Sequence, residues 1–412
     1  MNCADRSLNK QDIYIEDGII KEISFLIERD ADDIINADGL LCGPGIVDMH
    51  VHMRDPGQTH KEDMYTMSAA AAAGGVTTVL AMPNTNPPVS SVEVLSDILI
   101  RAKNAGINIL QAACVTENMC GDKLSDFSAL KAAGASAFSD DGRPVENARI
   151  MLQALKAAAA LDVPVLSHAE DLNIVNGGIM NEGEISRRLG VKGIDRASED
   201  ASTAREAALA AASGCGIHIC HVSTRGSLAI IRDAKRRGVK ITCETAPHYF
   251  TLTDDVLLSR DADYRMNPPL REREDVEAVI RGIIDGTIDA LATDHAPHTP
   301  QEKADFETAP NGIIGLETLL PISYTNLVRA GHIDIFKLFE LLTYNPAAIL
   351  RTAANRFNEG DRADFVIFDP HEQFKVDVNK LHGKSKNTAF KNMSFYGVIK
   401  VTICGGNIIY QV

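Results

Sequence analysis

Gly43-Pro44-Gly45-Ile46-Val47-Asp48-Met49-His50-Val51-His52-Met53-Arg54-Asp55-Pro56-Gly57 is the stretch that decides the fold of this chain. An apolar run ends in two histidines one residue apart, and Pro-Gly elements lie on both sides of it. Residues at i and i+2 of a strand point to the same face, so His50 and His52 project together. Two adjacent imidazoles at the end of a buried strand can bind one metal ion. An isolated His-x-His is more often a hydrogen-bonded pair in a buried strand, so the interpretation depends on the rest of the chain.

Composition and charge narrow the class of protein. The chain has 412 residues, 45% of them hydrophobic and 24% charged, which is typical of a soluble globular protein. Its net charge of −15 argues against nucleic acid or an anionic membrane as the main partner, and an anionic substrate would need cations at its site. The eight cysteines are scattered without a paired motif, which indicates reduced thiols. With no signal peptide and no apolar stretch of membrane-spanning length, we expect a cytoplasmic protein.

Eight apolar strand candidates alternate with helical segments from residue 45 to about residue 350. The strand candidates are Ile46–His52, Thr77–Met82, Ile109–Val115, Ala135–Ser139, Val163–His168, Ile217–His221, Lys240–Glu244 and Ile288–Asp294. This pattern predicts a (β/α)8 TIM barrel over residues 45–350, which would be the catalytic domain. A doubly wound open sheet is the alternative. Closure is favoured because no Gly-x-Gly-x-x-Gly follows the first strand, and because the first and last strands both end in residues of metal-ligand type.

Both ends of the chain have the pattern of short strands. Residues 1–44 predict strands at Asp12–Ile15, Ile19–Phe25 and Asp33–Leu41, with a hairpin turn at Asp17-Gly18. Residues 351–412 predict strands at Asp364–Asp369, Lys400–Cys404 and Ile408–Tyr410. We expect the two ends to pair into one small β-sandwich domain beside the barrel.

Metal-ligand residue types follow five of the eight predicted strands. These residues are His50 and His52, Asp140-Asp141, His168, His221, and Asp294-His295. In a barrel of this type the active site lies at the C-terminal ends of the strands, so these side chains converge on one mouth. Each residue alone is more often a turn or a cap, but five such strand ends are hard to obtain by accident. Four histidines and two aspartates exceed the needs of one tetrahedral ion, which favours two metal ions with a bridging carboxylate and hydroxide.

Five segments carry a resemblance to a known family. They are His50–Asp63, Ala81–Asn86, Phe138–Gly142, Met266–Leu270 and Ala292–His298. In this order they resemble the motifs of the class I dihydroorotases of the amidohydrolase superfamily, and the likeness runs from about residue 12 to the C-terminus. The resemblance implies reversible hydrolysis of (S)-dihydroorotate to N-carbamoyl-L-aspartate, a step of pyrimidine (UMP) biosynthesis. Relative to the family, the chain begins at the second strand of the β-sandwich, so we expect that domain to have one strand fewer.

The resemblance also implies the metal ligands. His50, His52 and Asp294 would hold one divalent ion, most simply zinc, and His168 and His221 would hold the second. Asp141 would bridge the two ions. Many relatives use a carboxylated lysine there, but the segment Phe138–Arg143 contains none. Asp140 is the alternative bridge, because strand alternation allows only one of the two aspartates to point inward.

The expected chemistry follows from such a centre. Two dications lower the pKa of a bridging water toward 7, and the resulting hydroxide would attack the ring amide carbonyl. Asp294 would take the proton and pass it to the departing nitrogen, acting first as general base and then as general acid. Arg54 lies on the face of His52 and is placed to hold the substrate carboxylate. The alternative for Arg54 is a salt bridge at the rim with Asp55 or Glu62.

The resemblance assigns the remaining substrate contacts. Asn84 and His298 would share the carboxylate, Asn267 would contact the ring, and the backbone at Asn311-Gly312 would close over it. We hypothesise that the polar segment 299–311 is a lid that orders when substrate binds.

The segment His60-Lys61-Glu62 and the residue His218 resemble active-site residues, but we expect both to have structural roles. We interpret His60-Lys61-Glu62 as a cap of the helix that follows it. His218 lies three residues before His221, so we expect it on the opposite face of the strand, toward the helices.

Other functions stay open at this point. The rivals are a hydantoinase or allantoinase, a deaminase of the same superfamily with a single metal ion, and a non-catalytic homologue that scaffolds aspartate transcarbamoylase. The Arg-Asp-Pro-Gly segment at Arg54 and the missing lysine argue against the first, and the complete set of six ligands argues against the last. The partner we expect is a small-molecule substrate. A homodimer, or an association with aspartate transcarbamoylase as in some class I relatives, is not decided by the sequence.

Overall fold

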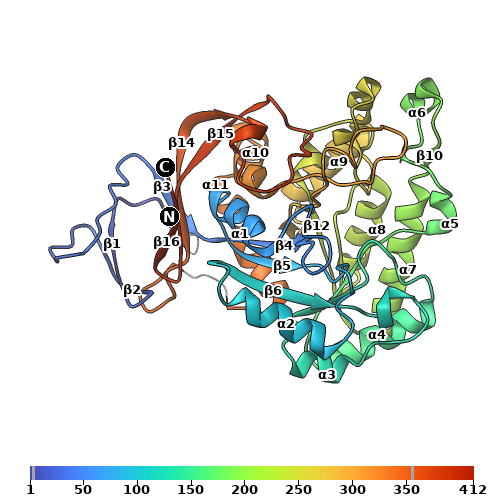
Figure 1. Ribbon diagram of the computed structural model, residues 1–412, viewed down its shortest axis with the longest axis horizontal. Coiled ribbons are helices and arrows are strands. Elements are labelled where there is room, and N and C mark those ends of the chain that lie inside the picture. Colours follow the sequence, from blue (N-terminus) through green and yellow to red (C-terminus); the bar gives the residue numbers. More distant parts are fainter. Residues whose placement is uncertain (2–4, 354–356) are drawn as a thin grey trace.

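One parallel sheet of eight strands dominates the computed structural model, which describes residue 1, residues 5–353 and residues 357–412 (Figure 1). Its strands are β4 (Ile46–Val51), β5 (Val76–Ala81), β6 (Asn108–Ala113), β7 (Ala137–Ser139), β8 (Val165–Ser167), β11 (Ile217–Ile219), β12 (Ile241–Thr245) and β13 (Ala290–Leu291). They lie side by side in sequence order. The barrel predicted from the sequence is therefore confirmed. Cys3, one of the eight cysteines expected to be reduced, lies outside the described residues.

The first and last strands of the sheet meet at their C-terminal ends. The backbone N–H of His52 donates to the carbonyl oxygen of His295 at 2.8 Å, and Val51 and His295 form an isolated parallel bridge. No longer ladder joins β4 to β13 among the described residues, so the barrel is nearly closed. The bridge lies beside the residues that the sequence analysis placed at the mouth.

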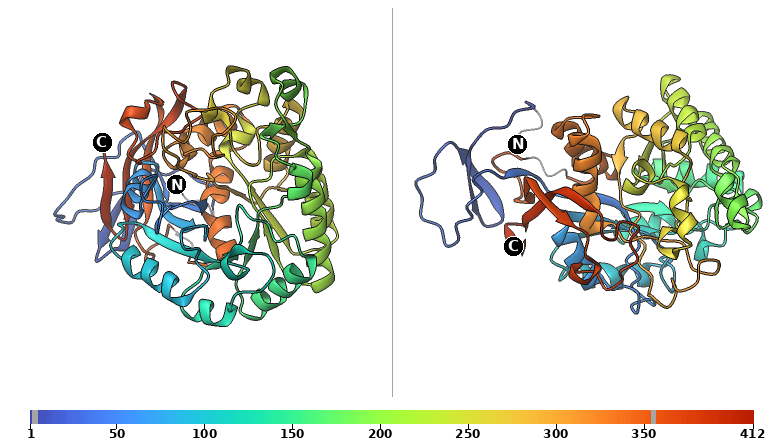
Figure 2. Two further views of the ribbon diagram at one scale, coloured as in Figure 1. Left: turned by 45° about the vertical axis from the view of Figure 1, so that its right-hand side comes forward. Right: turned by 90° about the horizontal axis from the view of Figure 1, so that it is seen from above.

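Helices cover the outside of the barrel (Figure 2). They are α1 (Met64–Ala73), α2 (Val92–Ala102), α3 (Phe127–Ala132), α4 (Ala148–Ala160), α7 (Ala197–Ser213), α8 (Arg225–Arg236) and α9 (Arg273–Ile284), followed after β13 by α10 (Leu319–Ser323) and α11 (Ile335–Phe339). The last helix, α12 (Asn345–Leu350), instead packs Ala347 and Leu350 against the inward side chains of the barrel. Val79 packs outward in the large core shared with the outer helices, whereas Leu80, the next residue, packs inward with Met49 and Leu166. Because both faces are buried, the strands read as continuous apolar runs. No helix in the described part of the chain has the length and apolar character needed to span a membrane.

Short elements that the sequence analysis did not predict lie between β8 and α7. They are α5 (Leu172–Val175), β9 (Met180–Asn181), α6 (Glu184–Leu189) and β10 (Gly193–Ile194). Each is too short to carry a readable hydrophobic period.

The two ends of the chain pair in an antiparallel sheet at one end of the molecule (Figures 1 and 2). Its strands are β3 (Leu41–Pro44), β14 (Phe365–Lys375), β15 (Ser394–Cys404) and β16 (Asn407–Gln411), in the order β16-β15-β14-β3. The hairpin of β1 (Asp12–Glu16) and β2 (Ile19–Ser24) packs apolar side chains against Phe365 and Val401 of this sheet. The expected joining of both termini in one β unit is confirmed. Division of the chain at residues 44 and 350 into separate domains stays a prediction.

The turn predicted between the first two strands is present, but the third predicted strand was wrong over most of its length. Asp17 (φ 53) and Gly18 (φ 74) both have left-handed backbone, as a type I′ hairpin turn requires. The segment expected as a strand at Asp33–Leu41 is irregular until Leu41. Asn36 accepts the N–H of Asp38 at 3.0 Å, and this local turn competes with strand pairing.

Candidate metal centre and substrate pocket

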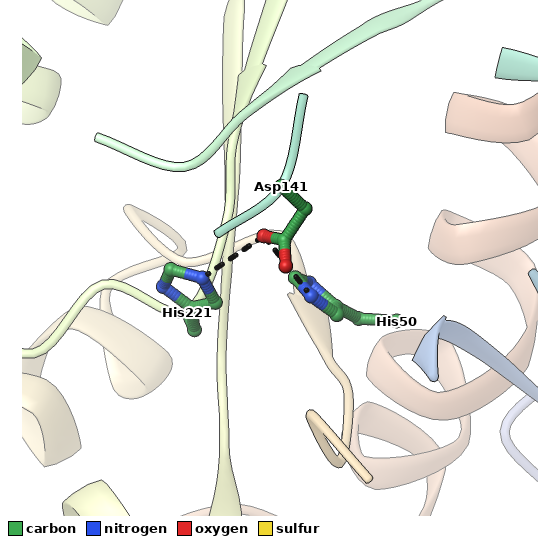
Figure 3. Close-up of side chains that lie close together, drawn as sticks. All are labelled: His50, Asp141 and His221. Carbon is green, nitrogen blue, oxygen red and sulfur yellow. Dashed lines mark ion pairs between the residues drawn. The ribbon is translucent and has the colours of Figure 1, made fainter. Parts of the chain in front are cut away.

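The carboxylate of Asp141 lies among four imidazoles. Its Oδ1 is 3.3 Å from Nε2 of His50, 3.4 Å from Nδ1 of His168 and 3.5 Å from Nε2 of His221. Its Oδ2 is 3.4 Å from Nε2 of His52. Figure 3 shows Asp141 between His50 and His221, which come from opposite sides of the barrel. All five side chains are buried.

Asp294 completes this group of predicted ligands. Its Oδ1 is 3.1 Å from Nε2 of His52 and 3.7 Å from Nε2 of His50. Asp294 (φ 50) and His221 (φ 36) both adopt left-handed backbone, which is uncommon for residues other than glycine. Each follows the end of a strand, and backbone strain of this kind is concentrated at functional sites. The structure thus brings together all six side chains that the sequence analysis selected as ligands.

Only one of the two neighbouring aspartates faces the imidazoles. The carboxylate of Asp140 instead accepts the backbone N–H of Val115 at 2.7 Å and that of Thr116 at 3.2 Å. Asp140 therefore fastens the adjacent loop, and the geometry favours Asp141 over Asp140 as the inward carboxylate.

Two glutamates that the sequence analysis missed hold the outer nitrogens of the histidine rings. Nδ1 of His50 is 2.8 Å from Oε1 of Glu244, and Nε2 of His168 is 3.0 Å from Oε2 of Glu170. A carboxylate on the outer nitrogen fixes the ring and leaves the inner lone pair for a metal ion. A signal was available for Glu244, because it ends the seventh apolar strand as the other candidates end theirs.

The electrostatics of the cluster suit a bound cation. Burial alone would raise the pKa of Asp141, but His50 and the other imidazoles hold it well below its ordinary value. Burial likewise opposes ionisation of His168, yet Asp141 and Glu170 raise its pKa to about 10. Burial would also raise the pKa of Asp294, and His52 lowers it.

The donor atoms fit metal ions. Nε2 of His50 and Oδ1 of Asp141 are buried without a hydrogen-bond partner. Among the described residues, three overlapping groups have ligand atoms within 4.8 Å of one another: His50 with Asp141 and His221, His50 with His52 and Asp294, and His50 with Cys220 and Glu244 on its outer side. The residues present could therefore hold a metal at this mouth.

A cationic pocket adjoins the cluster. Arg54 is 8% exposed; its Nε donates to the carbonyl of Pro297 at 3.3 Å, and its Nη2 is 3.4 Å from Nε2 of His298. Burial lowers the pKa of Arg54 to about 10. Burial, with Arg54 and Lys61, lowers the pKa of His298 to about 3, so this ring is neutral at pH 7.

The acidic neighbours proposed as an alternative partner of Arg54 have other partners. Asp55 pairs with Arg101 at 2.9 Å, and Glu62 accepts the N–H of Lys384 at 3.0 Å. Arg54 thus remains directed toward His298 inside the pocket rather than toward the rim.

The other predicted substrate contacts lie beside the metal cluster or beside His298. The amide oxygen Oδ1 of Asn84 accepts from Nδ1 of His52 at 2.8 Å, which leaves the amide nitrogen of Asn84 available. The amide nitrogen of Asn267 donates to Glu170 at 3.1 Å, on the side of the cluster. The carbonyl of Asn311 accepts from Nε2 of His298 at 2.9 Å. Gly312 has φ 150, and a Cβ there would meet the carbonyl oxygen of Ala296 at 2.7 Å, so a side chain is excluded.

The segment proposed as a lid is packed against the barrel in this structure. Lys303 is 9% exposed, and its Nζ donates to the carbonyls of Arg265 (3.1 Å), Pro310 (3.0 Å) and Gly312 (3.1 Å). These bonds hold the segment against the barrel. A rearrangement on substrate binding stays a prediction.

The expected cap of the helix after the His60-Lys61-Glu62 segment was wrong. Asp63 is the N-cap of α1, and its side chain accepts the N–H groups of Tyr65 and Thr66. Asp63, rather than a residue of the preceding segment, caps the helix because its short carboxylate reaches the N–H groups of the first turn. Lys61 instead lines the cavity at the mouth, a space of about 740 Å³ that Asn84 and Glu302 also line.

The expected orientation of His218 was also wrong. Its Nδ1 is 2.9 Å from the hydroxyl of Thr242 and its Nε2 is 3.5 Å from Oε2 of Glu244, which contacts His50. His218 therefore points into the barrel. The prediction failed because β11 ends at Ile219 and the left-handed backbone of His221 breaks the alternation from which the face was counted.

Comparisons with known proteins agree with this geometry. Residues 39–227 match a family model described as Dihydro-orotase-like. The chain is 47% identical over 403 residues to the dihydroorotase of Geobacter metallireducens, covering 97% of this chain and 95% of that protein. It is 46% identical over 402 residues to the dihydroorotase of Acetivibrio thermocellus, covering 97% and 94%.

Solved structures with the same fold include hydantoinases. The L-hydantoinase (dihydropyrimidinase) of Arthrobacter aurescens superimposes with a TM-score of 0.85 at 26% identity, covering 97% of this chain and 92% of that one. A D-hydantoinase superimposes with a TM-score of 0.86 at 24% identity, covering 100% and 93%, which shows the fold alone. The identity to the curated relatives extends over nearly the whole of both chains. This chain therefore belongs to the dihydroorotase family.

Proposed function

We propose that this chain hydrolyses (S)-dihydroorotate reversibly to N-carbamoyl-L-aspartate, a step of pyrimidine (UMP) biosynthesis. The observation that carries the proposal is the carboxylate of Asp141 among four imidazoles, beside a pocket with the buried cation Arg54. The substrate combines an amide to be hydrolysed with a carboxylate to be held. The cluster around Asp141 suits the amide, and the pocket with Arg54 suits the carboxylate.

We further propose that the centre holds two zinc ions. His50, His52 and Asp294 would hold one ion, His168 and His221 the other, and Asp141 both. When bound, such ions provide hydroxide near neutral pH and polarise a carbonyl. The unpartnered buried atoms of His50 and Asp141 support this assignment.

Asp294 is the group that we assign to proton transfer. Its carboxylate lies at the mouth beside His52, and its pKa is low enough for it to be ionised at neutral pH. It accepts the proton of the attacking water as the new C–O bond forms. It returns that proton to the ring nitrogen as the C–N bond breaks. In the direction of ring closure the same carboxylate performs the two transfers in reverse.

The remaining residues orient the ring. Arg54 and the neutral ring of His298 bind the substrate carboxylate, and the amide of Asn84 shares it. Asn267 contacts the ring, and the backbone at Asn311-Gly312 closes the far side. A bidentate guanidinium fixes the orientation of a carboxylate as well as its charge. This fixation brings the scissile amide to the metal cluster.

Ring-opening rates of the purified, metal-replete chain on dihydroorotate, hydantoin and allantoin test the proposal. We expect dihydroorotate to be opened fastest, because only its carboxylate uses Arg54. Faster opening of hydantoin or allantoin would replace the proposal with another cyclic amide hydrolase. A metal content below about one ion per chain without turnover would favour a non-catalytic scaffold for aspartate transcarbamoylase instead.

We also propose a cytoplasmic location, which the seven unpaired cysteines of the described residues support. Light scattering on the chain alone, and mixed with aspartate transcarbamoylase, tests whether it forms a homodimer or such a complex.

A further inference from the structure

Lys61 has no assigned role, although it lies inside the substrate pocket. It belongs to the loop between β4 and α1, lines the cavity at the mouth, and has a side chain that is 13% exposed. Its Nζ is 2.8 Å from Oε1 of Glu302 and 3.4 Å from Nδ1 of His298. A lysine buried to this degree needs partners, and one of the two is a proposed substrate contact.

The partners of His298 determine which of its nitrogens carries the proton. A backbone carbonyl only accepts hydrogen bonds, so Nε2, which is 2.9 Å from the carbonyl oxygen of Asn311, carries the hydrogen. Nη2 of Arg54 only donates, but at 3.4 Å it is the longer contact to this nitrogen, so the carbonyl determines the tautomer. An ammonium group only donates, so Nδ1 presents its lone pair to Lys61. The Glu302 carboxylate is 3.6 Å from Nδ1, beyond hydrogen-bond distance. Lys61 is therefore the donor that favours this tautomer.

The tautomer matters for anion binding. Nε2 is the ring nitrogen nearest a carboxylate held by Arg54, because Nη2 of Arg54 lies 3.4 Å from it. Its hydrogen, which bonds the carbonyl of Asn311, is the one that such a carboxylate can share or take over. If the hydrogen moved to Nδ1, a bare lone pair would face the substrate carboxylate and repel it.

We propose that Lys61 is a positioning residue that keeps His298 in the tautomer that donates to the substrate carboxylate. This inference rests on the proposed function, which assigns His298 to that carboxylate. Lys61 acts through the ring and through its own charge, and it takes no part in the hydrolysis of the amide. Its effect therefore belongs to the affinity for substrate rather than to the chemical step.

Steady-state kinetics of the metal-replete Lys61→Met variant give the first test. We expect KM for dihydroorotate to rise roughly tenfold, as for loss of one charge-assisted hydrogen bond, with kcat nearly unchanged. Lys61→Arg keeps a donor and a charge and should restore most of the affinity. The matched control is Lys384→Met, because Lys384 donates to the carbonyl of Thr59 at 2.6 Å in the same loop without touching His298. This control should leave KM unchanged.

Glu302→Gln separates the proposal from a simple ion pair. If Lys61 served only to pair with Glu302, this variant would raise KM as much as Lys61→Met does. The proposal expects an unchanged or lower KM, because Lys61 then directs its full charge toward His298. A fall in kcat with unchanged KM in Lys61→Met, or an equal loss in Lys384→Met, would overturn it.

Nitrogen NMR of histidine-labelled protein gives a readout that loop stability does not move. The signals of His298 are assigned by their loss in His298→Gln. We expect a protonated Nε2 and a bare Nδ1 in the wild type, and a mixture of tautomers in Lys61→Met. The same tautomer in both proteins would refute the role of Lys61. If the wild type failed to open dihydroorotate, the proposed function would be refuted. The NMR result would still show whether Lys61 controls the tautomer of His298 or only pairs with Glu302.

Discussion

Two histidines at the mouth of the barrel are equally buried, but their pKa values are shifted in opposite directions. His168 and His298 are each 5% exposed. Burial lowers the pKa of both rings, but Asp141 and Glu170 raise that of His168 to about 10, whereas Arg54 and Lys61 help to lower that of His298 to about 3. The neighbours, rather than the depth of burial, therefore decide what each ring can bind.

This difference divides the mouth into two parts. The metal cluster (His50, His52, Asp141, His168, His221 and Asp294) gathers negative charge and suits dications. The cationic pocket (Arg54, Lys61 and His298) gathers positive charge and suits a carboxylate. A chain of net charge −15 would repel an anionic substrate without such a local pocket.

The largest expected effect comes from the centre of the metal cluster. Asp141→Ala removes the carboxylate shared by four imidazoles, so we expect metal content below one ion per chain and at least a roughly 1,000-fold loss of turnover. Elemental analysis and kinetics on the same preparation measure both. Asp140→Asn is the matched control, since Asp140 bonds only the adjacent loop in the contacts described above, and it should keep its metal. Two ions retained by Asp141→Ala would contradict the assignment.

The next effect belongs to the cationic pocket. Arg54→Met should raise KM for dihydroorotate about 100-fold, because a buried charge-assisted contact is lost, while metal content stays unchanged. Arg143, which is exposed and lines the same cavity, supplies the control Arg143→Met, for which we expect a change of at most a few-fold. Equal losses in both variants would mean that the pocket attracts anions only through its overall field.

The buried ammonium group of Lys303 makes the stability of the fold sensitive to pH. Burial lowers its pKa from 10.5 to about 8, so the cost of burying the charged amine is fully present below pH 8. As the pH rises, the folded chain releases this proton before the unfolded chain does. The free energy of unfolding of the wild type, relative to Lys303→Met, should therefore rise by ~2 kcal/mol between pH 8 and pH 10. Urea unfolding at several pH values measures it, and a flat or falling difference would contradict the burial argument.

The smallest effect tests the outer support of the metal cluster. Glu244→Gln keeps the shape of the side chain beside His50 but removes its charge, so metal affinity should fall roughly tenfold. Competition with a chelator measures it. Glu206→Gln is the control, because Glu206 is buried on α7 and bonds Ser167 and Arg205 rather than a ligand histidine. Unchanged affinity in Glu244→Gln would show that the ring needs no carboxylate behind it.

The barrel and the six converging side chains could be predicted from the sequence because each side chain follows an apolar strand. That pattern survives even where the strand itself is only two residues long, as at β13 before Asp294. The roles of Glu170 and Lys61 could not be predicted, because they depend on which nitrogen of a neighbouring ring faces inward. Spacing along the chain does not encode this. His218 was misplaced for a related reason, since one left-handed residue reverses the face on which its neighbours lie.

The contact between the first and last strands of the barrel, β4 and β13, has a consequence for folding during synthesis. Leu41 of β3 pairs with Phe368 of β14, and His52 after β4 donates to His295 after β13. Strands made early in synthesis therefore complete their pairing only after strands made late have formed. Within the metal cluster, His52 comes from the β4 side of this contact and Asp294 from the β13 side. A nascent or truncated chain that ends before residue 294 thus cannot assemble all six proposed ligands, and we expect capture of metal to be a late event that reports complete synthesis and closure.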